Sequence, residues 1–391
     1  MAWNMVDERE QRVRFVIRAS EQQRNFSQLC REFGISRPTG YLWWRRYARE
    51  KLAGLEEKSR RPQHSPQRTL ATTEQRIVEL RQQRPDWGAR KLQPLLAEQG
   101  VKLPVITVHR VLLRQGLVRP ADRHEAAVQR FQRAAPNELW QMDFKSPKGW
   151  EQAVGPLAVL DDHSRYVIVL AQTGTTRSAA VREQLQTAFL ACGLPQAMLM
   201  DHGTPWWNPA AASGWTELTV WLMRQGIQLH YGRLRHPQTQ GKVERFNGAL
   251  EMARRRRGLP PASGRQQWLD EFRYEYNHIR PHEALAMRTP ASVWRVSERR
   301  YDPQPPAWDY GAGAEVHRLD GAGQLRLAGH RWPVSQALRG QWVEVKRIGE
   351  QLLVYYCQSW VRGIDLAAQR STAVDRWAQP SICKECGDND V

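Results

Sequence analysis

The sequence predicts a multidomain chain with an all-α N-terminal region, a central α/β domain and a small C-terminal β-barrel. Three observations lead to this fold class. Apolar residues recur at helical spacing through the first third of the chain, β-prone runs alternate with amphipathic helical runs in the centre, and short alternating runs follow near the C-terminus. Two segments without periodic apolar residues separate these regions and are predicted to be linkers.

Length and composition restrict the class of protein. The 391 residues are enough for several domains, and 41% hydrophobic with 25% charged residues is typical of globular chains. No apolar run reaches the length of a membrane span, and the N-terminus lacks the apolar core of a signal peptide. Five cysteines are too few for a disulfide framework in a chain of this size. We therefore expect an intracellular protein without a membrane partner.

The positive charge is concentrated in the N-terminal third. Residues 1–135 carry 27 Lys and Arg against 14 Asp and Glu, a net charge of 27 − 14 = +13. Residues 136–391 carry 31 against 26, a net charge of 31 − 26 = +5. This asymmetry favours an N-terminal region that binds nucleic acid, although a ribosome-associated or membrane-surface protein would share it.

Residues 1–56 are predicted to form a helix-turn-helix domain. The run "FSQLCREFGIS" has apolar residues at helical spacing, Gly34 breaks that helix, and Ser36 can cap the next one, "RPTGYLWWRRYARE". The alternative is a small helical bundle with a basic surface. The candidate DNA-binding residues of the second helix are Arg37, Thr39 and Arg45.

A polar linker at 57–73 precedes a second predicted helix-turn-helix domain at 74–135. One basic helix begins after Trp87-Gly88, and a further helix follows Pro104. Neither helix has a Ser or Asp cap in the sequence. The candidate DNA-binding residues here are Arg90, Lys91, Thr107 and Arg110.

The central region, residues 136–298, is predicted to be a mixed sheet flanked by helices. "ELWQMDFKS" predicts a strand, and "PLAVLDDHSRYVIVLAQT" predicts a hairpin around an Asp-Asp-His-Ser turn. An amphipathic helix ending at Gly193, the strand "QAMLM", and another helix and strand follow. A proline-rich linker at 299–314 leads to short alternating strands at 315–366, which predict the small β-barrel, and to a tail at 367–391 that is predicted to be disordered.

Three acids of the central region are candidate catalytic residues and metal ligands. Asp143 lies in the first strand, Asp201 ends the strand "AMLM", and Glu244 lies near the start of a late helix. Several buried carboxylates close together need cations to neutralise them. Two Mg²⁺ ions would do so and would serve phosphoryl transfer, although each acid taken singly is better explained as structural. Asp161 and Asp162 lie in the hairpin turn, where Asp is common for local reasons.

The stretch "HPQTQGKVERFNGAL" places Glu244 among cations and amides. Lys242, Arg245 and Asn247 are candidate DNA-binding residues, and the alternative is a solvated helix face on which Glu244 pairs with Lys or Arg. The "RRRR" run at 254–257 is either a phosphate clamp or a solvated face. Trp206 and Trp207 are either core residues or platforms for an unpaired base, and Cys383 with Cys386 is better explained by a tail than by half a zinc site.

The motifs "NELWQMDF", "AVLDDHSRYVIVLA", "MDHGTPWW", "RHPQTQGKVERFNGAL" and "YNHIRPHEALAMRTPASVW" resemble those of DDE transposases of bacterial insertion sequences. The likeness is to the IS481 type, related to IS3 and to retroviral integrases, and it spans nearly the whole chain. It implies an RNase H-like integrase catalytic core with two Mg²⁺ or Mn²⁺ ions per active site. The DDE motif falls on Asp143, Asp201 and Glu244.

Two departures from the family pattern are visible. Asp201 and Glu244 are separated by 42 residues, more than in retroviral integrases, and His202 follows Asp201 where related enzymes often have Asn. The zinc-binding domain of retroviral integrases is replaced by the helix-turn-helix region. The first departure places an enlarged loop at "WWNPAAASGW".

The resemblance implies an Mg²⁺-dependent nuclease and strand transferase that carries out DNA transposition and integration, a form of DNA recombination. It would bind double-stranded DNA at the terminal inverted repeats, cleave the element ends and join the 3′-hydroxyl to target DNA. It would act as a homodimer or higher oligomer in the cytoplasm, associated with the bacterial nucleoid. A non-cutting DNA-binding regulator derived from a transposase and a phage- or retroelement-type integrase are the alternatives.

Overall fold

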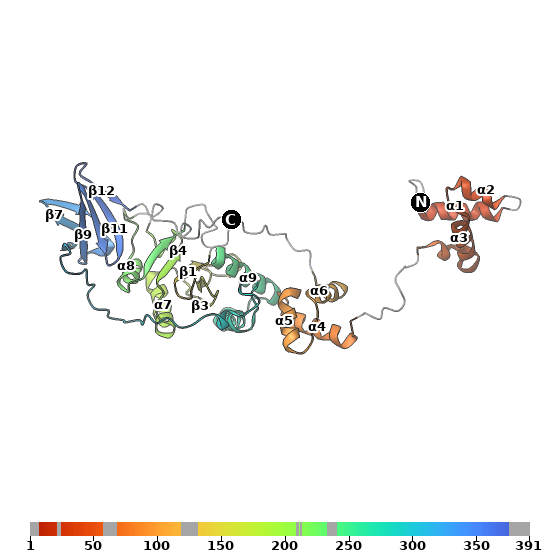
Figure 1. Ribbon diagram of the computed structural model, residues 1–391, viewed down its shortest axis with the longest axis horizontal. Helices are drawn as coiled ribbons and strands as arrows, with labels where there is room; N and C mark the ends of the chain where they lie inside the picture. The colour runs from red at the N-terminus through yellow and green to blue at the C-terminus, as the bar shows by residue number, and fades with distance from the viewer. Residues whose placement is uncertain are drawn as a thin grey trace, which may run out of the picture. The chain divides into compact units, whose positions relative to one another are not determined.

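The computed structural model describes residues 8–21, 25–57, 69–118, 132–208, 211, 213–232 and 241–374. The chain divides into two compact units, Met1–Thr69 and Leu70–Val391 (Figure 1). Within these described ranges, no helix is both long enough and apolar enough to cross a membrane.

Unit 1 is a cluster of short helices around an aromatic core. The helices are α1 (Glu8–Ser20), α2 (Phe26–Glu32), α3 (Arg37–Glu50) and the 3-10 helix η1 (Lys51–Leu55). Phe15, Leu29 and Trp43 are buried between them. As the sequence predicts, Ser36 caps α3, because its hydroxyl accepts a hydrogen bond from the Thr39 backbone at 3.4 Å. Gly34 supplies the positive φ of 63° that the turn between α2 and α3 requires.

Unit 2 begins with a second helical cluster. Its helices are α4 (Ala71–Gln83), α5 (Ala89–Glu98) and α6 (Val105–Arg114). Trp87, Leu92 and Val108 are fully buried among them. Neither Gly88 before α5 nor Pro104 before α6 makes a side-chain cap. These helices therefore depend on the buried apolar faces between them rather than on capping hydrogen bonds.

A five-stranded mixed sheet follows, with strand order β3-β2-β1-β4-β5. β1 pairs antiparallel with β2 and parallel with β4, β2 pairs antiparallel with β3, and β4 pairs parallel with β5. The strands are β1 (Leu139–Phe144), β2 (Leu157–Asp161), β3 (Val167–Ala171), β4 (Ala197–Met200) and β5 (Gln228–Tyr231). This is the α/β layer that the strand and helix patterns predict.

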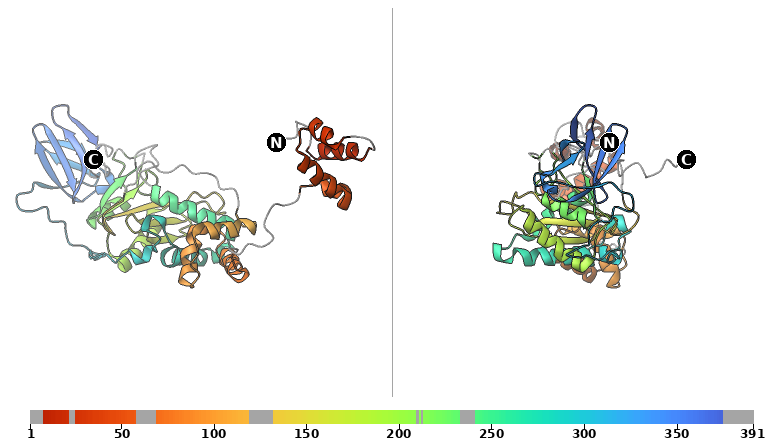
Figure 2. Two further views of the ribbon diagram at one scale, coloured as in Figure 1. Left: turned by 45° about the vertical axis from the view of Figure 1, so that its right-hand side comes forward. Right: turned by 90° about the vertical axis from the view of Figure 1, so that its left-hand side faces the viewer.

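Helices cover both faces of this sheet (Figure 2). One face packs on α7 and α8, and the other packs on α9 and α10. The helices are α7 (Ser178–Cys192), α8 (Glu217–Arg224), α9 (Gly241–Arg257) and α10 (Arg265–Tyr274), with a π-helical turn η4 (Glu275–Ile279) and the 3-10 turns η3 (Ala262–Gly264), η5 (Glu283–Leu285) and η6 (Pro290–Ser292). Trp140 and Met142 of β1 belong to the α7 side. Because side chains alternate along a strand, Gln141 and Asp143 face α9.

The C-terminal strands form an open antiparallel sheet of order β12-β11-β10-β9-β6, beside the hairpin β7-β8. The elements are β6 (Val316–Arg318), β7 (Gln324–Leu327), β8 (His330–Pro333), η7 (Gln336–Leu338), β9 (Trp342–Ile348), β10 (Gln351–Tyr356), β11 (Ser359–Asp365) and β12 (Arg370–Ala373). The short antiparallel strands agree with the sequence, but their pairing among the described residues does not close into the expected barrel. Two edge strands, β6 and β12, remain.

This sheet packs on the α/β layer. The Trp215 indole donates a hydrogen bond to the Val361 carbonyl at 3.3 Å, and the hydroxyls of Ser213 and Ser335 lie 2.8 Å apart. The expectation of a disordered tail from residue 367 is wrong for β12, which pairs with β11 through a register that the sequence pattern does not reveal. Cys383 and Cys386 lie outside the described residues.

Candidate active site

The three candidate acids come from three neighbouring elements of the α/β layer. Asp143 lies in the second half of β1, and Asp201 directly follows β4. Since β1 and β4 are parallel neighbours, their carboxyl ends lie at the same edge of the sheet. Glu244 lies in the first turn of α9, which packs on the face of the sheet toward which Asp143 points.

The environment of Asp143 disfavours its charged form. Burial, together with the negative charges of Asp201 and Glu244, raises the pKa of this carboxyl to about 6. The Asn247 amide opposes this shift by donating a hydrogen bond to Asp143 at 3.0 Å. Asp201 and Glu244 therefore lie close enough to Asp143 to interact with it electrostatically. No cationic side chain contributes to the shift of the Asp143 pKa.

Asp201 is held in place by the loop that follows it. Its Oδ1 accepts hydrogen bonds from the Gly203 backbone at 2.9 Å and from the Trp206 indole. A side chain at Gly203 would bring a Cβ to 3.0 Å from that carboxylate, so the close approach favours glycine. Trp206 is 1% exposed and stacks on Phe144, with ring centroids 5.5 Å apart. Its face is therefore unavailable to a DNA base.

Glu244 and Asp201 are both exposed, whereas Asp143 is half-buried. Partial burial alone raises the pKa of Glu244. Within the described residues Glu244 has no ion-pair partner, unlike Glu251 two turns later, which pairs with Arg254 and Arg255. An ion pair on a solvated face, the alternative that the sequence left open for Glu244, is not formed.

The donor set suits a hard divalent cation, since it consists of carboxylate oxygens only. In the described part of the chain, no three His, Cys, Asp or Glu side chains form a group that could hold an ion as they stand. The chemistry and the shared edge of these acids fit a metal that would draw them together.

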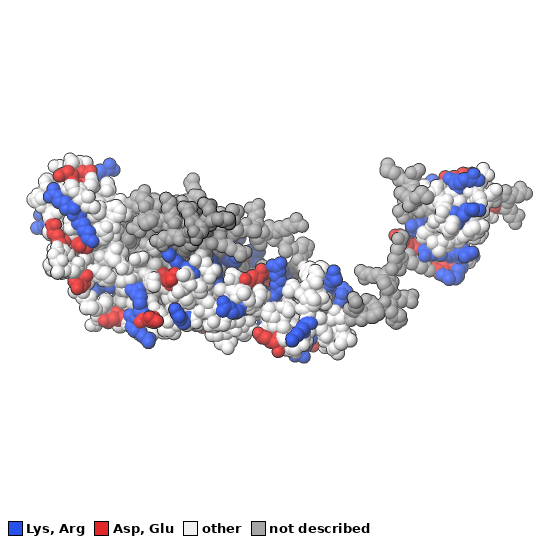
Figure 3. Space-filling view, viewed as in Figure 1, with Lys and Arg blue, Asp and Glu red and all other residues white. Residues whose placement is uncertain are grey.

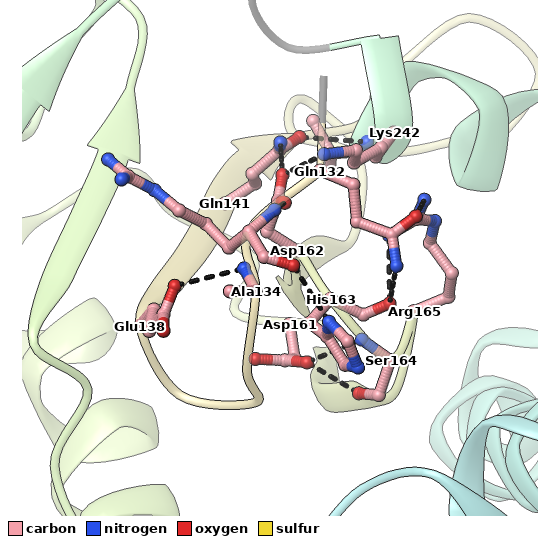
Figure 4. A network of polar contacts seen from close by, with 12 residues as sticks. Gln132, Ala134, Glu138, Gln141, Asp161, Asp162, His163, Ser164, Arg165 and Lys242 are labelled. Atoms are coloured by element: carbon pink, nitrogen blue, oxygen red, sulfur yellow. Dashed lines mark hydrogen bonds and ion pairs between the residues drawn. The ribbon is translucent and has the colours of Figure 1, made fainter. Parts of the chain in front are cut away.

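Two of the three candidate DNA-binding residues on α9 point into the protein. Asn247 is 8% exposed and contacts Asp143. Lys242 pairs with Asp162, whose carboxylate is fully buried (Figure 4). Burial lowers the pKa of Lys242 to about 8, although the charge of Asp162 opposes that shift. Arg245 alone of these three is exposed. Sequence spacing identified the helix but not the direction of each side chain.

The Asp161-Asp162 turn is rich in donors, as expected for a structural turn. Asp161 accepts hydrogen bonds from the Asn137 backbone at 2.7 Å and from both the backbone and the hydroxyl of Ser164. Asp162 accepts from the Arg133 backbone and from the Gln141 amide, each at 2.8 Å. Gln141 was not identified from the sequence. Its position two residues before Asp143 is the only signal that could have pointed to it.

The DNA-binding candidates of the helical regions differ in exposure. Arg37, Arg45 and Arg110 are exposed, and Thr107 is half-buried. The Thr39 hydroxyl lies 2.8 Å from the Ser36 hydroxyl and so belongs to the cap of α3. Figure 3 shows Lys and Arg side chains on the visible faces of both units.

Arg90 is also exposed, and Lys91 is half-buried. Arg90 pairs with Glu283 at 3.0 Å. Burial, together with the charge of Arg280, lowers the pKa of Lys91 to about 8. Both residues therefore have charged neighbours within unit 2.

Three of the four arginines at 254–257 have acidic partners. Arg254 and Arg255 both contact Glu251 at 2.7 Å. Arg257 contacts Asp86 at 2.6 Å and Glu275 at 2.7 Å, which ties α9 to the second helical cluster. Arg257 is therefore part of a largely buried ion-pair network rather than of a solvated face or an open phosphate clamp.

Family comparisons agree with the order of these regions along the chain. Residues 133–237 and 225–290 each match an integrase core domain. Residues 11–63 match a helix-turn-helix domain, and residues 39–112 match a homeodomain-like domain. The fold and these matches define a protein that combines helix-turn-helix domains with an integrase core domain.

Two relatives come from insertion elements. The chain is 26% identical over 223 residues to an uncharacterized 31.7 kDa protein of insertion element IS407 from Burkholderia multivorans, covering 55% of this chain and 78% of that protein. It is 27% identical over 250 residues to an uncharacterized 39.2 kDa protein of insertion element IS476 from Xanthomonas euvesicatoria, covering 62% and 70%. The chain is thus similar to proteins of bacterial insertion elements.

Solved structures with a weaker likeness include the HTLV-2 integrase catalytic core domain in complex with magnesium, in its trimeric form. The TM-score is 0.32 at 16% identity, covering 41% of this chain and 97% of that one. A chain from the simian T-cell lymphotropic virus intasome in complex with a PP2A regulatory subunit gives a TM-score of 0.36 at 15% identity, covering 76% and 98%.

Proposed function

We propose that this protein is a DDE transposase of the IS481 type. It acts on the bacterial nucleoid, where its helix-turn-helix domains (residues 1–56 and 74–135) bind the terminal inverted repeats of its element. Its integrase core (residues 136–298) hydrolyses a phosphodiester at each element end and joins the freed 3′-hydroxyl to target DNA. The observation that carries this proposal is the group of Asp143, Asp201 and Glu244 around one edge of the sheet, with mutually unfavourable charges. The similarity to insertion-element proteins supports it.

Asp143, Asp201 and Glu244 would hold two Mg²⁺ or Mn²⁺ ions. Bound there, such ions supply charge stabilisation for an in-line displacement at phosphorus and lower the pKa of the attacking oxygen. The protein's own groups orient the ligands. Asn247 fixes one oxygen of Asp143, and Trp206 fixes one oxygen of Asp201. The exposed Arg245 is available to a phosphate of the scissile strand.

The reaction proceeds in two displacements that use the same site. In the first, water attacks phosphorus, the bond to the 3′-oxygen breaks, and a 3′-hydroxyl and a 5′-phosphate result. In the second, that 3′-hydroxyl attacks a target phosphodiester and releases a target 3′-hydroxyl. Because two ends must be joined together, we infer at least a homodimer on DNA.

The test uses the full chain with DNA that carries the inverted repeats flanking its gene. With Mg²⁺ or Mn²⁺ the wild-type protein is expected to nick the ends and to form joined products on a gel. Asp143→Asn, Asp201→Asn and Glu244→Gln are each expected to lower both steps by at least about 10³-fold, because each removes the charge of one ligand. Binding of intact ends, measured by mobility shift, is expected to persist.

Two outcomes would overturn parts of this proposal. Near-normal joining by one of the three variants would remove that residue from the site. A wild-type protein that binds the ends and cuts with neither metal would identify a non-cutting regulator.

The DNA-binding role is tested separately through salt dependence. Arg37→Ala, Arg45→Ala and Arg110→Ala remove exposed cations, and each is expected to reduce the slope of log affinity against log salt by about 1. Lys91→Ala is the matched comparison, because Lys91 is enclosed within unit 2. An equal change in slope for Lys91→Ala would show that exposure does not identify the DNA-contacting residues.

A further inference from the structure

One fully buried carboxylate connects three separate segments of unit 2. Asp162 is 0% exposed, and its Oδ1 accepts hydrogen bonds from the Gln141 amide at 2.8 Å and from the Lys242 ammonium. Its Oδ2 accepts from the Arg133 backbone at 2.8 Å. Figure 4 shows Gln141, Asp162 and Lys242 converging from β1, from the turn after β2 and from α9. The strand and the helix are therefore connected through one acid.

Gln141 contacts α9 a second time. Its Oε1 accepts a hydrogen bond from the Val243 backbone at 3.2 Å. The first backbone N–H groups of a helix have no partner within the helix, so an acceptor from another element satisfies one of them. Gln141 is 1% exposed, and both ends of its amide are used in this way. The first turn of α9 is thus attached to β1 by one direct hydrogen bond and by one link through Asp162.

These contacts lie next to two of the candidate catalytic acids. Gln141 precedes Asp143 by two residues and faces the same side of β1. Lys242 and Val243 immediately precede Glu244. Any rotation or sliding of the first turn of α9 would move Glu244 relative to Asp143, and it would also break the contacts of Lys242 and Val243.

We propose that Asp162, Gln141 and Lys242 form a positioning unit that holds the first turn of α9, and with it Glu244, against the strand that carries Asp143. The inference deepens the proposed function, on which its catalytic consequence rests. Lys242 acts through Glu244 and Asp162 and makes no contact with DNA. Its side chain is 14% exposed, and leaving Asp162 for a phosphate would leave a buried carboxylate without its cation.

The experiment compares Lys242→Met, Asp162→Asn, the double variant and Lys242→Arg in the full chain. Hydrogen exchange of the amides of residues 243–246 measures the attachment of α9 directly. Lys242→Met and Asp162→Asn are each expected to speed this exchange. The double variant is expected to exchange no faster than Asp162→Asn alone, because that substitution already removes the ion pair with Lys242. Lys242→Arg keeps the charge and is expected to retain slow exchange.

Strand transfer gives the second readout. At saturating DNA, Lys242→Met and Asp162→Asn are each expected to lower the single-turnover rate about tenfold to a hundredfold, as misplacement of a catalytic group does. The affinity for inverted-repeat DNA is expected to stay unchanged. The matched control is Lys346→Met, which breaks a pair with Glu344 (3.3 Å) in the C-terminal sheet and should change neither readout.

Asp162→Asn separates this role from a DNA contact. If Lys242 binds phosphate, removing the charge of Asp162 frees it, so that the rate stays equal or rises while Lys242→Met weakens DNA binding. That pattern would overturn the proposal. Should Asp162→Asn fail to fold, Gln141→Leu removes the acceptor of the Val243 amide without changing a charge. Unchanged hydrogen exchange at the Val243 amide in that variant would also overturn the proposal. A wild-type protein without strand transfer would refute the proposed function, whereas the exchange readout would still decide the positioning role.

Discussion

Asp143 and Asp161 lie on adjacent antiparallel strands of one sheet, three positions apart in the register, and their surroundings differ. Burial raises the pKa of both carboxyls. At Asp161, three donors from Asn137 and Ser164 oppose that effect. At Asp143, the neighbours include the acids Asp201 and Glu244, and the hydrogen bonds that oppose the shift come from the Phe144 backbone and the Asn247 amide.

The comparison shows that the number of acids does not distinguish a candidate catalytic site from a structural turn. The Asp161-Asp162 turn has two buried acids side by side, yet every carboxylate oxygen of that pair accepts at least one hydrogen bond. At the other end of the sheet, Asp143 and Asp201 also accept hydrogen bonds, but no cationic side chain among the described residues pairs with Asp143, Asp201 or Glu244. Charge without such a partner is costly in a folded protein unless a ligand offsets it. Incomplete compensation, rather than acidity, identifies the candidate site.

The largest expected effect concerns the pH dependence of stability in metal-free protein. The pKa of Asp143 is about 6 in the folded state against 3.8 for a free side chain. A raised pKa contributes stability that is fully present below about pH 4 and is lost as the pH rises through 6. From the shift of about two units, the loss is up to about 3 kcal/mol.

Urea unfolding with a chelator at pH 4.5 and pH 7.5 measures this effect. Asp143→Asn lacks the titrating group, so its stability relative to wild type is expected to increase with pH. Added Mg²⁺ is expected to stabilise the wild-type protein more than the variant. An identical pH dependence in both proteins would mean that the pKa of Asp143 is not raised in the folded state.

The second prediction concerns Asp161→Asn, which should act in the opposite direction. An amide accepts through one oxygen only, so its NH₂ group would face donors from Asn137 or Ser164. We expect a loss of about 1–3 kcal/mol in unfolding free energy at pH 7.5. Strand transfer per folded molecule should remain close to wild type. A lost rate with unchanged stability would assign Asp161 to the catalytic group.

A smaller effect is expected for Trp206→Phe. The introduced Phe ring can still stack on Phe144, but the indole N–H that donates a hydrogen bond to Asp201 is lost. We expect the strand-transfer rate to fall about tenfold, equivalent to about 1.4 kcal/mol, and the Mn²⁺ concentration for half-maximal activity to rise. Trp215→Phe is the control, because its indole bonds to Val361 instead. Equal effects on rate in both variants would show that Trp206 acts only through packing.

The smallest effect is expected for Glu251→Gln, on the same helix as Glu244. Hydrogen bonds from Arg254 lower the pKa of Glu251 to about 2, and Arg255 adds to this effect. The stability that this contributes is present above pH 4.5 and is lost as the pH falls toward 2. We expect a loss of about 0.5–1 kcal/mol at pH 7, as for other partly exposed pairs, with strand transfer unchanged. If Glu251→Gln lowered strand transfer as much as is expected for Glu244→Gln, the distinction between acids with and without an ion-pair partner would be contradicted.

Much of the local structure could be predicted from the sequence because it depends on neighbours along the chain. Ser36 caps α3 through the backbone three residues later, and Gly34 makes the preceding turn. Alternating and helical periodicities place Asp143 in a strand, Asp201 after a strand and Glu244 in the first turn of a helix. These features need only short-range geometry, which the residue pattern specifies.

The partners of several charged side chains were decided by the tertiary structure, although local pairs such as Glu251 with Arg254 and Arg255 follow from helical spacing. Lys242 and Arg245 are equivalent in the sequence as cations beside Glu244, yet Lys242 points inward to Asp162 and Arg245 is exposed. Arg257, within a run of four arginines, reaches Asp86, 171 residues away. The sequence by itself determined which elements form and which of them carry acids. Burial and pairing depend on which elements pack together, and no local pattern encodes that choice, because the contacting groups come from distant parts of the chain.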